Sequence, residues 1–147
     1  SKSRALASSL QTMLEDPVVD SILQSKCGFD AIKQYRTDLA AARKDFENTR
    51  AEPKEQLASL YMAFIISNNI LKWRIVQDYN AVKEWHLFLD DFRRIYPNVS
   101  EISDAILAII DEFGGLESIE QKKSIFSKIS KKYNLEDILT IDPPSRT

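Results

Sequence analysis

The sequence predicts an all-α fold, a single compact multi-helix bundle of six or seven helices with short loops around a central apolar helix. Only three glycines and five prolines occur among 147 residues, whereas an all-β sandwich or barrel needs many more turn residues. The composition, 44% hydrophobic and 29% charged, is typical of a globular chain. The stretch 54–96 contains neither Gly nor Pro and carries apolar residues at helical spacing almost throughout.

The N-terminal region is predicted to form two short helices separated by a proline. Residues 4–14 place apolar side chains on one face of a helix. Asp16 and Pro17 then form a typical helix start, with Asp16 as the N-cap and Pro17 at the first helical position. The second helix is expected to end near Cys27, with Gly28 available for a left-handed cap.

A longer helix is predicted over residues 29–50. Its apolar stripe consists of Phe29, Ile32, Tyr35, Leu39, Ala42 and Phe46. The opposite face mixes bases with acids, Asp38 and Asp45 among them, and is typical of a solvated surface. The run of small residues at 40–42 would allow a neighbouring helix to approach closely.

The stretch 54–96 is too long to be one helix of a compact domain. A single helix would reach about 65 Å, whereas a domain of this size has a radius of gyration of about 15 Å. We therefore expect a break at 78–80, where Asp78 and Asn80 can cap a new helix, with 67–69 as the alternative. The part before the break is apolar on most sides, which predicts a core helix without functional information.

Helix boundaries are also marked in the C-terminal half. The helix after the break ends at Pro97, and the next one is expected to begin with Asn98 or Ser100 as its cap and to end at 114–115. Ser118 and Gln121 have the spacing of a capping box, which starts the last long helix. A further turn is expected over 135–139.

The chain is expected to form one helical domain over residues 1–141, followed by a linker-like tail at 142–147. The longest apolar run, 57–66, is far shorter than the roughly 20 residues of a membrane span, so no span is predicted. The N-terminus lacks the apolar segment of a secretory signal, and the single cysteine suits a reducing compartment. These observations favour a domain of a larger intracellular protein, cytoplasmic rather than secreted.

Catalytic and metal-binding patterns have little support in the sequence. His86 and Cys27 are the only histidine and the only cysteine, which excludes an intrachain disulfide and a Cys/His zinc site. They form a thiol–imidazole pair only formally, because nothing else around Cys27 suggests an active site. There is no Gly-rich phosphate loop. We therefore expect no enzyme, no cofactor and no metal.

Aromatic residues are unusually dense between residues 64 and 96. They are Phe64, Trp73, Tyr79, Trp85, Phe88, Phe92 and Tyr96. Any that stay uncovered would form an apolar patch of the kind that marks a protein interface, and Trp85 and Tyr96 are expected to be its exposed anchors. Acidic residues nearby would steer a basic partner. The predicted partner-binding residues are Trp85, Phe88, Asp90, Asp91, Phe92 and Tyr96.

Charge is unevenly distributed although the net charge is only −2. Residues 79–120 contain nine acids and three bases, whereas residues 121–133 contain five lysines and no acid. Lysines on one helix can contact the phosphates of a polyanion. The predicted polyanion-binding residues are Lys123, Lys128, Lys131 and Lys132.

Two functions follow from these surfaces. The leading hypothesis is a non-enzymatic protein–protein interaction or assembly domain, whose partner is another protein or a second copy of the chain. The alternative is a nucleic-acid-associated protein, such as a viral coat or nucleoprotein subunit or an RNA-binding protein, that uses the basic last helix together with Trp73 and Arg74 or with Arg93 and Arg94.

Overall fold

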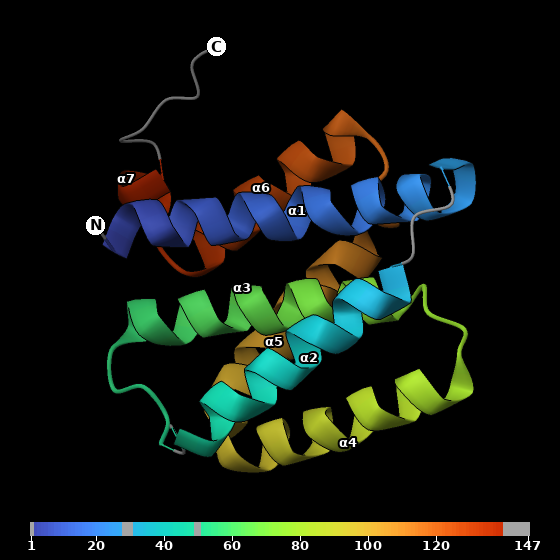
Figure 1. The fold of residues 1–147 in the computed structure, drawn as a ribbon. Coiled ribbons are helices and arrows are strands. Elements are labelled where there is room, and N and C mark those ends of the chain that lie inside the picture. Colours follow the sequence, from blue (N-terminus) through green and yellow to red (C-terminus); the bar gives the residue numbers. More distant parts are fainter. Residues whose placement is uncertain (1, 28–30, 49–50, 140–147) are drawn as a thin grey trace.

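The computed structural model describes residues 2–27, 31–48 and 51–139. This part of the chain contains six long helices, one short helix and no strand (Figure 1). The helices are α1 (Lys2–Cys27), α2 (Ala31–Asn48), α3 (Gln56–Trp73), α4 (Tyr79–Ile95), α5 (Pro97–Glu112), α6 (Ile119–Lys132) and α7 (Glu136–Leu139). The predicted all-α bundle is confirmed. The cap at Gly28 and the tail at 142–147 lie outside the described residues.

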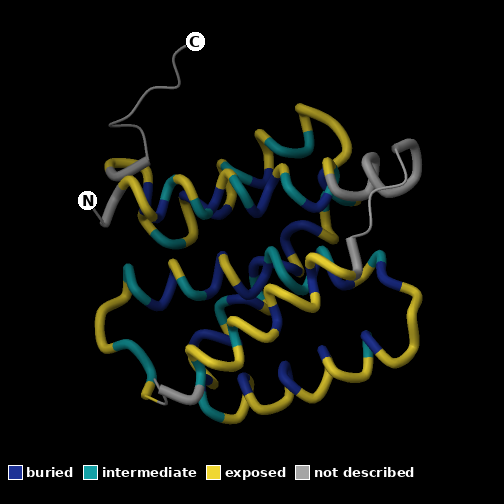
Figure 2. The backbone as a smooth tube through the Cα atoms, viewed as in Figure 1, coloured by how far each residue is buried: buried dark blue, intermediate teal, exposed yellow. Residues whose placement is uncertain are grey.

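The central helix is α3, which packs against α1 on one side and against α5 on another. Leu60, Ala63 and Phe64 are fully buried, and Figure 2 shows buried residues recurring along the helices at the core. The Oγ atoms of Ser67 on α3 and Ser103 on α5 lie 2.7 Å apart in a buried hydrogen bond. These small side chains allow the two helices to approach closely while both hydroxyls stay satisfied.

The predicted break at Pro17 is wrong, because α1 continues through it as one helix of 26 residues. An interior proline removes one helical hydrogen bond and costs about 3 kcal/mol. The helix persists because Leu10, Met13 and Leu14 bury their side chains in the core just before the proline. Asp16, predicted as an N-cap, instead pairs with Lys72 of α3 at 3.7 Å.

The predicted break at 78–80 is confirmed. α3 ends at Trp73 and α4 begins at Tyr79, with Asp78 as its N-cap. The Asp78 carboxylate accepts a hydrogen bond from the Ala81 N–H at 2.9 Å. The chain reverses direction here, so that α4 runs back below α3 in the view of Figure 1.

The predicted cap of α5 is wrong. Pro97 is the first residue of the helix, and neither Asn98 nor Ser100 is the N-cap. The Glu52 carboxylate, which lies on the segment before α3, accepts hydrogen bonds from the N–H groups of Asn98 at 2.6 Å and Val99 at 3.4 Å. A negative charge at a helix N-terminus also favours the helix dipole. This cap joins residues that are far apart in the sequence, so no local sequence pattern predicts it.

The end of α5 and the start of α6 form as predicted. Gly114 and Gly115 adopt positive φ angles of 79° and 116°, and α5 ends just before them. Ser118 and Gln121 form a complete capping box at the start of α6. The Gln121 amide also donates to the Phe113 carbonyl at 2.9 Å, which ties the two helix ends together.

Candidate protein-binding groove

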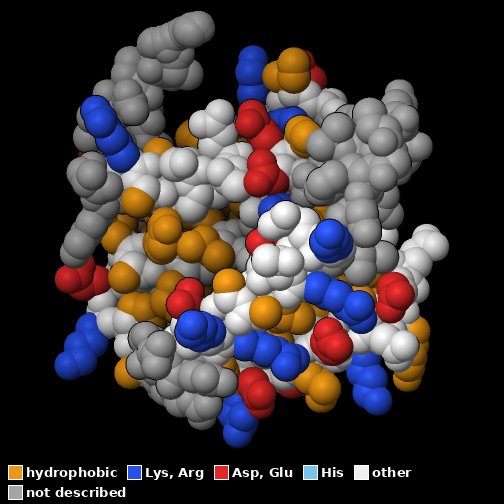
Figure 3. Space-filling view, in the orientation of Figure 1, with side chains coloured by type: hydrophobic (Ala, Val, Ile, Leu, Met, Phe, Trp, Pro, Cys, Tyr) orange, Lys and Arg blue, Asp and Glu red, His pale blue; other side chains and the backbone are white. Residues whose placement is uncertain are grey.

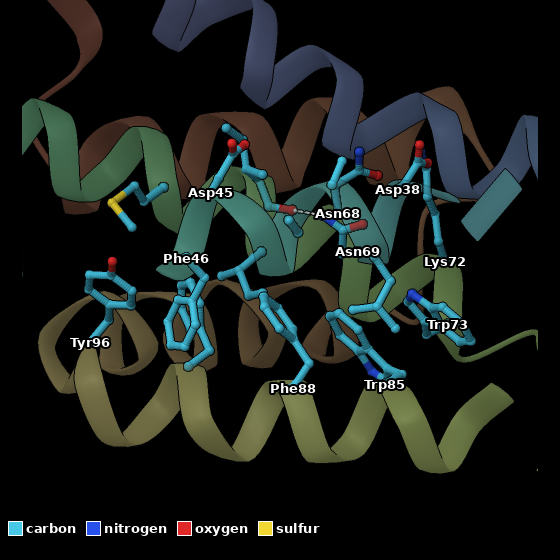
Figure 4. A pocket seen from close by; sticks show the side chains of 17 residues that line it. Asp38, Asp45, Phe46, Asn68, Asn69, Lys72, Trp73, Trp85, Phe88 and Tyr96 are labelled. Atoms are coloured by element: carbon cyan, nitrogen blue, oxygen red, sulfur yellow. Dashed lines mark hydrogen bonds between the residues drawn. The ribbon is translucent and has the colours of Figure 1, made fainter. Parts of the chain in front are cut away.

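A groove of about 520 Å³ lies between α2 and α3, with the aromatic face of α4 at its base (Figure 4). Its lining is mostly apolar, with a few polar side chains at the edges. From α2 come Asp38, Leu39, Ala41, Ala42, Asp45 and Phe46, and from α4 and the residue that directly follows it come Trp85, Phe88, Phe92 and Tyr96. From α3 come Met62, Ile65, Ile66, Asn68, Asn69, Lys72 and Trp73. We refer to this hollow as the α3 groove.

The base of the α3 groove is a continuous layer of aromatic rings. Trp73 and Trp85 are stacked with ring centroids 5.6 Å apart and an interplanar angle of 4°. Phe46 of α2 reaches the same layer and lies 5.5 Å from Phe88 and 5.7 Å from Tyr96, centroid to centroid. The layer therefore holds α2, α3 and α4 together beneath the groove and gives it a rigid base.

The α2 wall is fixed to α4 and to one end of α3. The Arg43 guanidinium donates to the Glu84 carbonyl at 2.9 Å, and Arg36 lies 3.8 Å from the Glu84 carboxylate. The Tyr35 ring packs 5.7 Å from Trp73, near the C-terminal end of α3. α2 thus touches α3 at Trp73, which forms one end of the hollow between the two helices.

A second hollow of about 290 Å³ adjoins the first on the α1 side of α3. Its lining consists of Ala5, Ser8, Ser9, Thr12, Tyr61, Ile65 and Asn68. Ile65 and Asn68 line both hollows, which therefore adjoin on the outer face of α3, and from here on the name α3 groove covers the two together. Figure 3 shows hydrophobic side chains gathered in a hollow between α1 and α2.

Large apolar side chains are exposed in this depression. Tyr61 and Ile65, one helical turn apart on α3, each leave 40% of their surface uncovered. Phe64, between them in the sequence, points about 100° away from Ile65 around the helix and is fully buried. An apolar strip flanked by two helix walls is a typical feature of a protein-binding surface.

Polar groups are few in the α3 groove and most of them sit at its rim. The Asn69 amide donates to the Ile65 carbonyl at 2.9 Å. Within the described residues, the Asn68 Oδ1 atom is buried and accepts no hydrogen bond. A buried acceptor without a donor costs free energy, which a bound molecule could recover by supplying an N–H or O–H.

The prediction that Trp85 and Tyr96 are exposed anchors is wrong. They are 4% and 2% exposed, because the reversal at Asp78 turns the aromatic face of α4 toward Trp73 and Phe46. Trp85 and Tyr96, with Phe88 and Phe92, nevertheless line the base of the α3 groove. The four predicted aromatic residues therefore meet at one site, below its surface rather than on it.

The predicted acidic residues do not join this site. Asp90 and Asp91 are exposed on α4 and do not line the groove. Asp91 forms an ion pair with Arg94 of the same helix. Asp111, another acid of the acidic stretch 79–120, pairs with Arg74 at 3.3 Å, and this pairing reduces the acidic character of that stretch.

The four predicted polyanion-binding lysines are exposed on α6 but do not converge. Lys128 lies 2.7 Å from the Glu112 carboxylate, and Lys132 lies over the Tyr133 ring. At about 100° per residue, Lys123 and Lys132 point to opposite sides of the helix. Burial raises the pKa of Tyr133, the residue that follows α6, and the negative charge of Glu101 on α5 raises it further. Lys131 is exposed.

The remaining residues considered for catalysis and metal binding lie apart from the groove. His86 is exposed on α4, and no three His, Cys, Asp or Glu side chains are grouped to hold a metal ion among the residues that the structure describes. Among those residues, no helix has both the length and the apolar character that crossing a membrane requires.

The sequence patterns did not single out several residues of the groove. They are Tyr61, Ile65, Asn68, Asp38 and Asp45. The available signal was the excess of apolar residues on α3, which exceeds what one buried face needs. By itself, that excess predicts that α3 is buried on most sides. Only the positions of α1 and α2 reveal that one strip remains uncovered.

The chain matches no protein-family model, no curated protein and no solved structure. Its function is therefore argued from the groove itself.

Proposed function

We propose that the chain is a non-enzymatic, helical protein-binding domain of an intracellular protein, and that it binds its partner in the α3 groove. The observation that carries this proposal is the uncovered apolar strip at Tyr61 and Ile65, which lies between two helix walls and above a fixed aromatic base. Burying such a strip releases about 25 cal/mol for each Å² of apolar surface.

The shape of the site favours a protein partner over a small substrate. The depression is long, open at its rim and lined mostly by aliphatic and aromatic side chains, and among the residues that the structure describes no cluster of titratable groups lies at its base. A catalytic site would need a nucleophile, acid or base aimed into the hollow. The rim acids, Asp38 and Asp45, are exposed and lie on the same wall.

Photo-crosslinking in the cells that produce the protein tests the proposal. Benzoylphenylalanine is placed in the full chain at Ile65, at Leu87 on the outer face of α4 or at Lys131 on α6. Leu87 is a matched control, because it is an exposed aliphatic residue (56%) outside the groove. We expect one adduct of defined mass at Ile65, which protease destroys and nuclease leaves intact. An excess of the unlabelled chain should suppress this adduct, whereas an excess of its Ile65→Glu variant should not.

Two results would contradict the proposal. One is the absence of any protein adduct at Ile65 under conditions where Leu87 yields one. The other is a nuclease-sensitive adduct at Lys131 alone, which would support the nucleic-acid alternative.

A further inference from the structure

We propose that the α3 groove binds an amphipathic α-helix whose apolar stripe lies on Tyr61 and Ile65 and whose basic residues face Asp38 and Asp45. This inference rests on the proposed function and specifies its partner. It draws on four independent features of the groove: its walls, the state of its backbone, its length and its charge.

The walls are built from small side chains. Ala5, Ser8, Ser9 and Thr12 of α1 line one side at helical spacing, and Ala41 and Ala42 of α2 line the other. Two helices pack with their axes 8–10 Å apart, and the shorter separations need small residues at the contact. The small residues on both walls therefore suit the close approach of an added helix.

Backbone hydrogen bonding favours a helix over an extended peptide. The walls of the groove are helices, whose N–H and C=O groups are already paired within each helix. An extended peptide in this hollow would bury its own backbone groups against apolar side chains, and each unpaired group is costly. A helix satisfies its backbone internally and presents only side chains.

The length of the groove suits about three helical turns. Along α3 it extends from Met62 to Trp73, about 16 Å at 1.5 Å per residue. The lining residues of α2, from Asp38 to Phe46, cover about 12 Å. A ligand helix of that length offers apolar side chains at positions i, i+3 or i+4, and i+7, the usual anchors of a helix bound in a groove.

Charge selects a basic helix. Asp38 and Asp45 are exposed and lie two helical turns apart on the α2 rim. Asp38 accepts a hydrogen bond from the Gln34 amide at 3.0 Å, and this neutral donor does not cancel its charge. Lys72, the lining base, already pairs with Asp16 at 3.7 Å and lies 5.9 Å from the Tyr35 ring centroid. Lys or Arg side chains of the ligand would face the two aspartates.

A defined peptide tests this partner chemistry. The probe has 16 residues with leucines on one face and lysines on both flanks, and it contains no tryptophan. Both tryptophans of the protein, Trp73 and Trp85, line the groove, so intrinsic fluorescence of the full chain reports occupancy directly. One control peptide carries glutamate in place of each lysine, and the other carries two central prolines that prevent helix formation.

We expect the basic peptide to bind at least tenfold more tightly than the acidic one and the proline peptide not to bind. Ile65→Glu should abolish binding, and the double variant D38K/D45K should weaken the basic peptide about tenfold, or about 1.4 kcal/mol. Leu87→Glu and Asp90→Lys, equivalent changes on the outer face of α4, should leave the affinity unchanged. Circular dichroism shows that each variant is folded.

Equal binding of the basic and acidic peptides would overturn the charge assignment, and equal binding of the proline peptide would overturn the helical ligand. If no peptide binds while the protein adduct at Ile65 persists, this inference fails and the proposed function stands. If both are lost, the proposed function fails as well.

Discussion

The two faces of α3 share one backbone but differ in what covers them. On the inner face, Leu60 and Phe64 are fully buried, and Ser67 is hydrogen-bonded to Ser103 of α5. On the outer face, Tyr61 and Ile65 remain 40% exposed between α1 and α2. Both faces are apolar, so hydrophobicity alone does not distinguish a core surface from a binding surface.

What distinguishes the faces is whether the chain itself supplies a partner helix. α5 packs directly on the inner face. α2 instead contacts α4 through Phe46 and Arg43 and leaves the adjacent part of α3 uncovered. The inner face therefore contributes to folding, and the outer face is the surface that we propose for binding a partner.

Truncation of neighbouring residues on the two faces should give the largest contrast. Phe64→Ala is expected to lower the free energy of unfolding by about 3–5 kcal/mol, because it leaves a cavity in the core. Ile65→Ala should cost about 1 kcal/mol, because its side chain is only partly buried. Urea unfolding monitored by circular dichroism measures both. Equal losses would mean that the outer face is also core.

The Ser67–Ser103 pair should behave as one unit. Replacing either serine with alanine is expected to cost about 1–2 kcal/mol, because the remaining hydroxyl stays buried without its partner. The double variant should cost less than the sum, since no hydroxyl is then left alone. A double-mutant cycle in urea measures the coupling, and additive losses would show that the hydrogen bond does not stabilise the α3–α5 contact.

The Asp78 cap holds α4 in the position that forms the base of the groove. Asp78→Ala is expected to cost about 1 kcal/mol, because the Ala81 N–H loses its acceptor. Asp90→Ala, an equivalent change at an exposed position within α4, should change stability by less than about 0.5 kcal/mol. Thermal unfolding measures the stability of both variants, and equal stabilities would show that the Asp78 cap does not stabilise the fold.

Local patterns predicted the parts of this fold that depend on neighbouring residues. The break at Asp78 and the capping box of Ser118 and Gln121 were predicted correctly, because a cap is formed by side chains three residues away. The glycine end of α5 belongs to the same class.

Features that depend on distant residues could not be predicted in this way. The local pattern at Pro17 indicates a helix start, but core packing of Met13 and Leu14 keeps α1 continuous. Glu52 caps α5 across more than 40 residues of sequence. The burial of Trp85 and Tyr96 depends on contacts with Trp73 of α3 and Phe46 of α2, and the exposure of Ile65 depends on where α2 lies. Helical periodicity carries no information about either.

Methyl NMR of the two methionines tests the central claim most directly, because one lines the α3 groove and the other does not. Met62 lines the groove, whereas Met13 is fully buried in the core and does not line it. With ¹³C-methyl methionine in the full chain, addition of the basic helical peptide should shift the Met62 signal and leave that of Met13 in place. A Met62 signal that stays fixed at saturating peptide, or a Met13 signal that moves as far, would contradict binding at the outer face of α3.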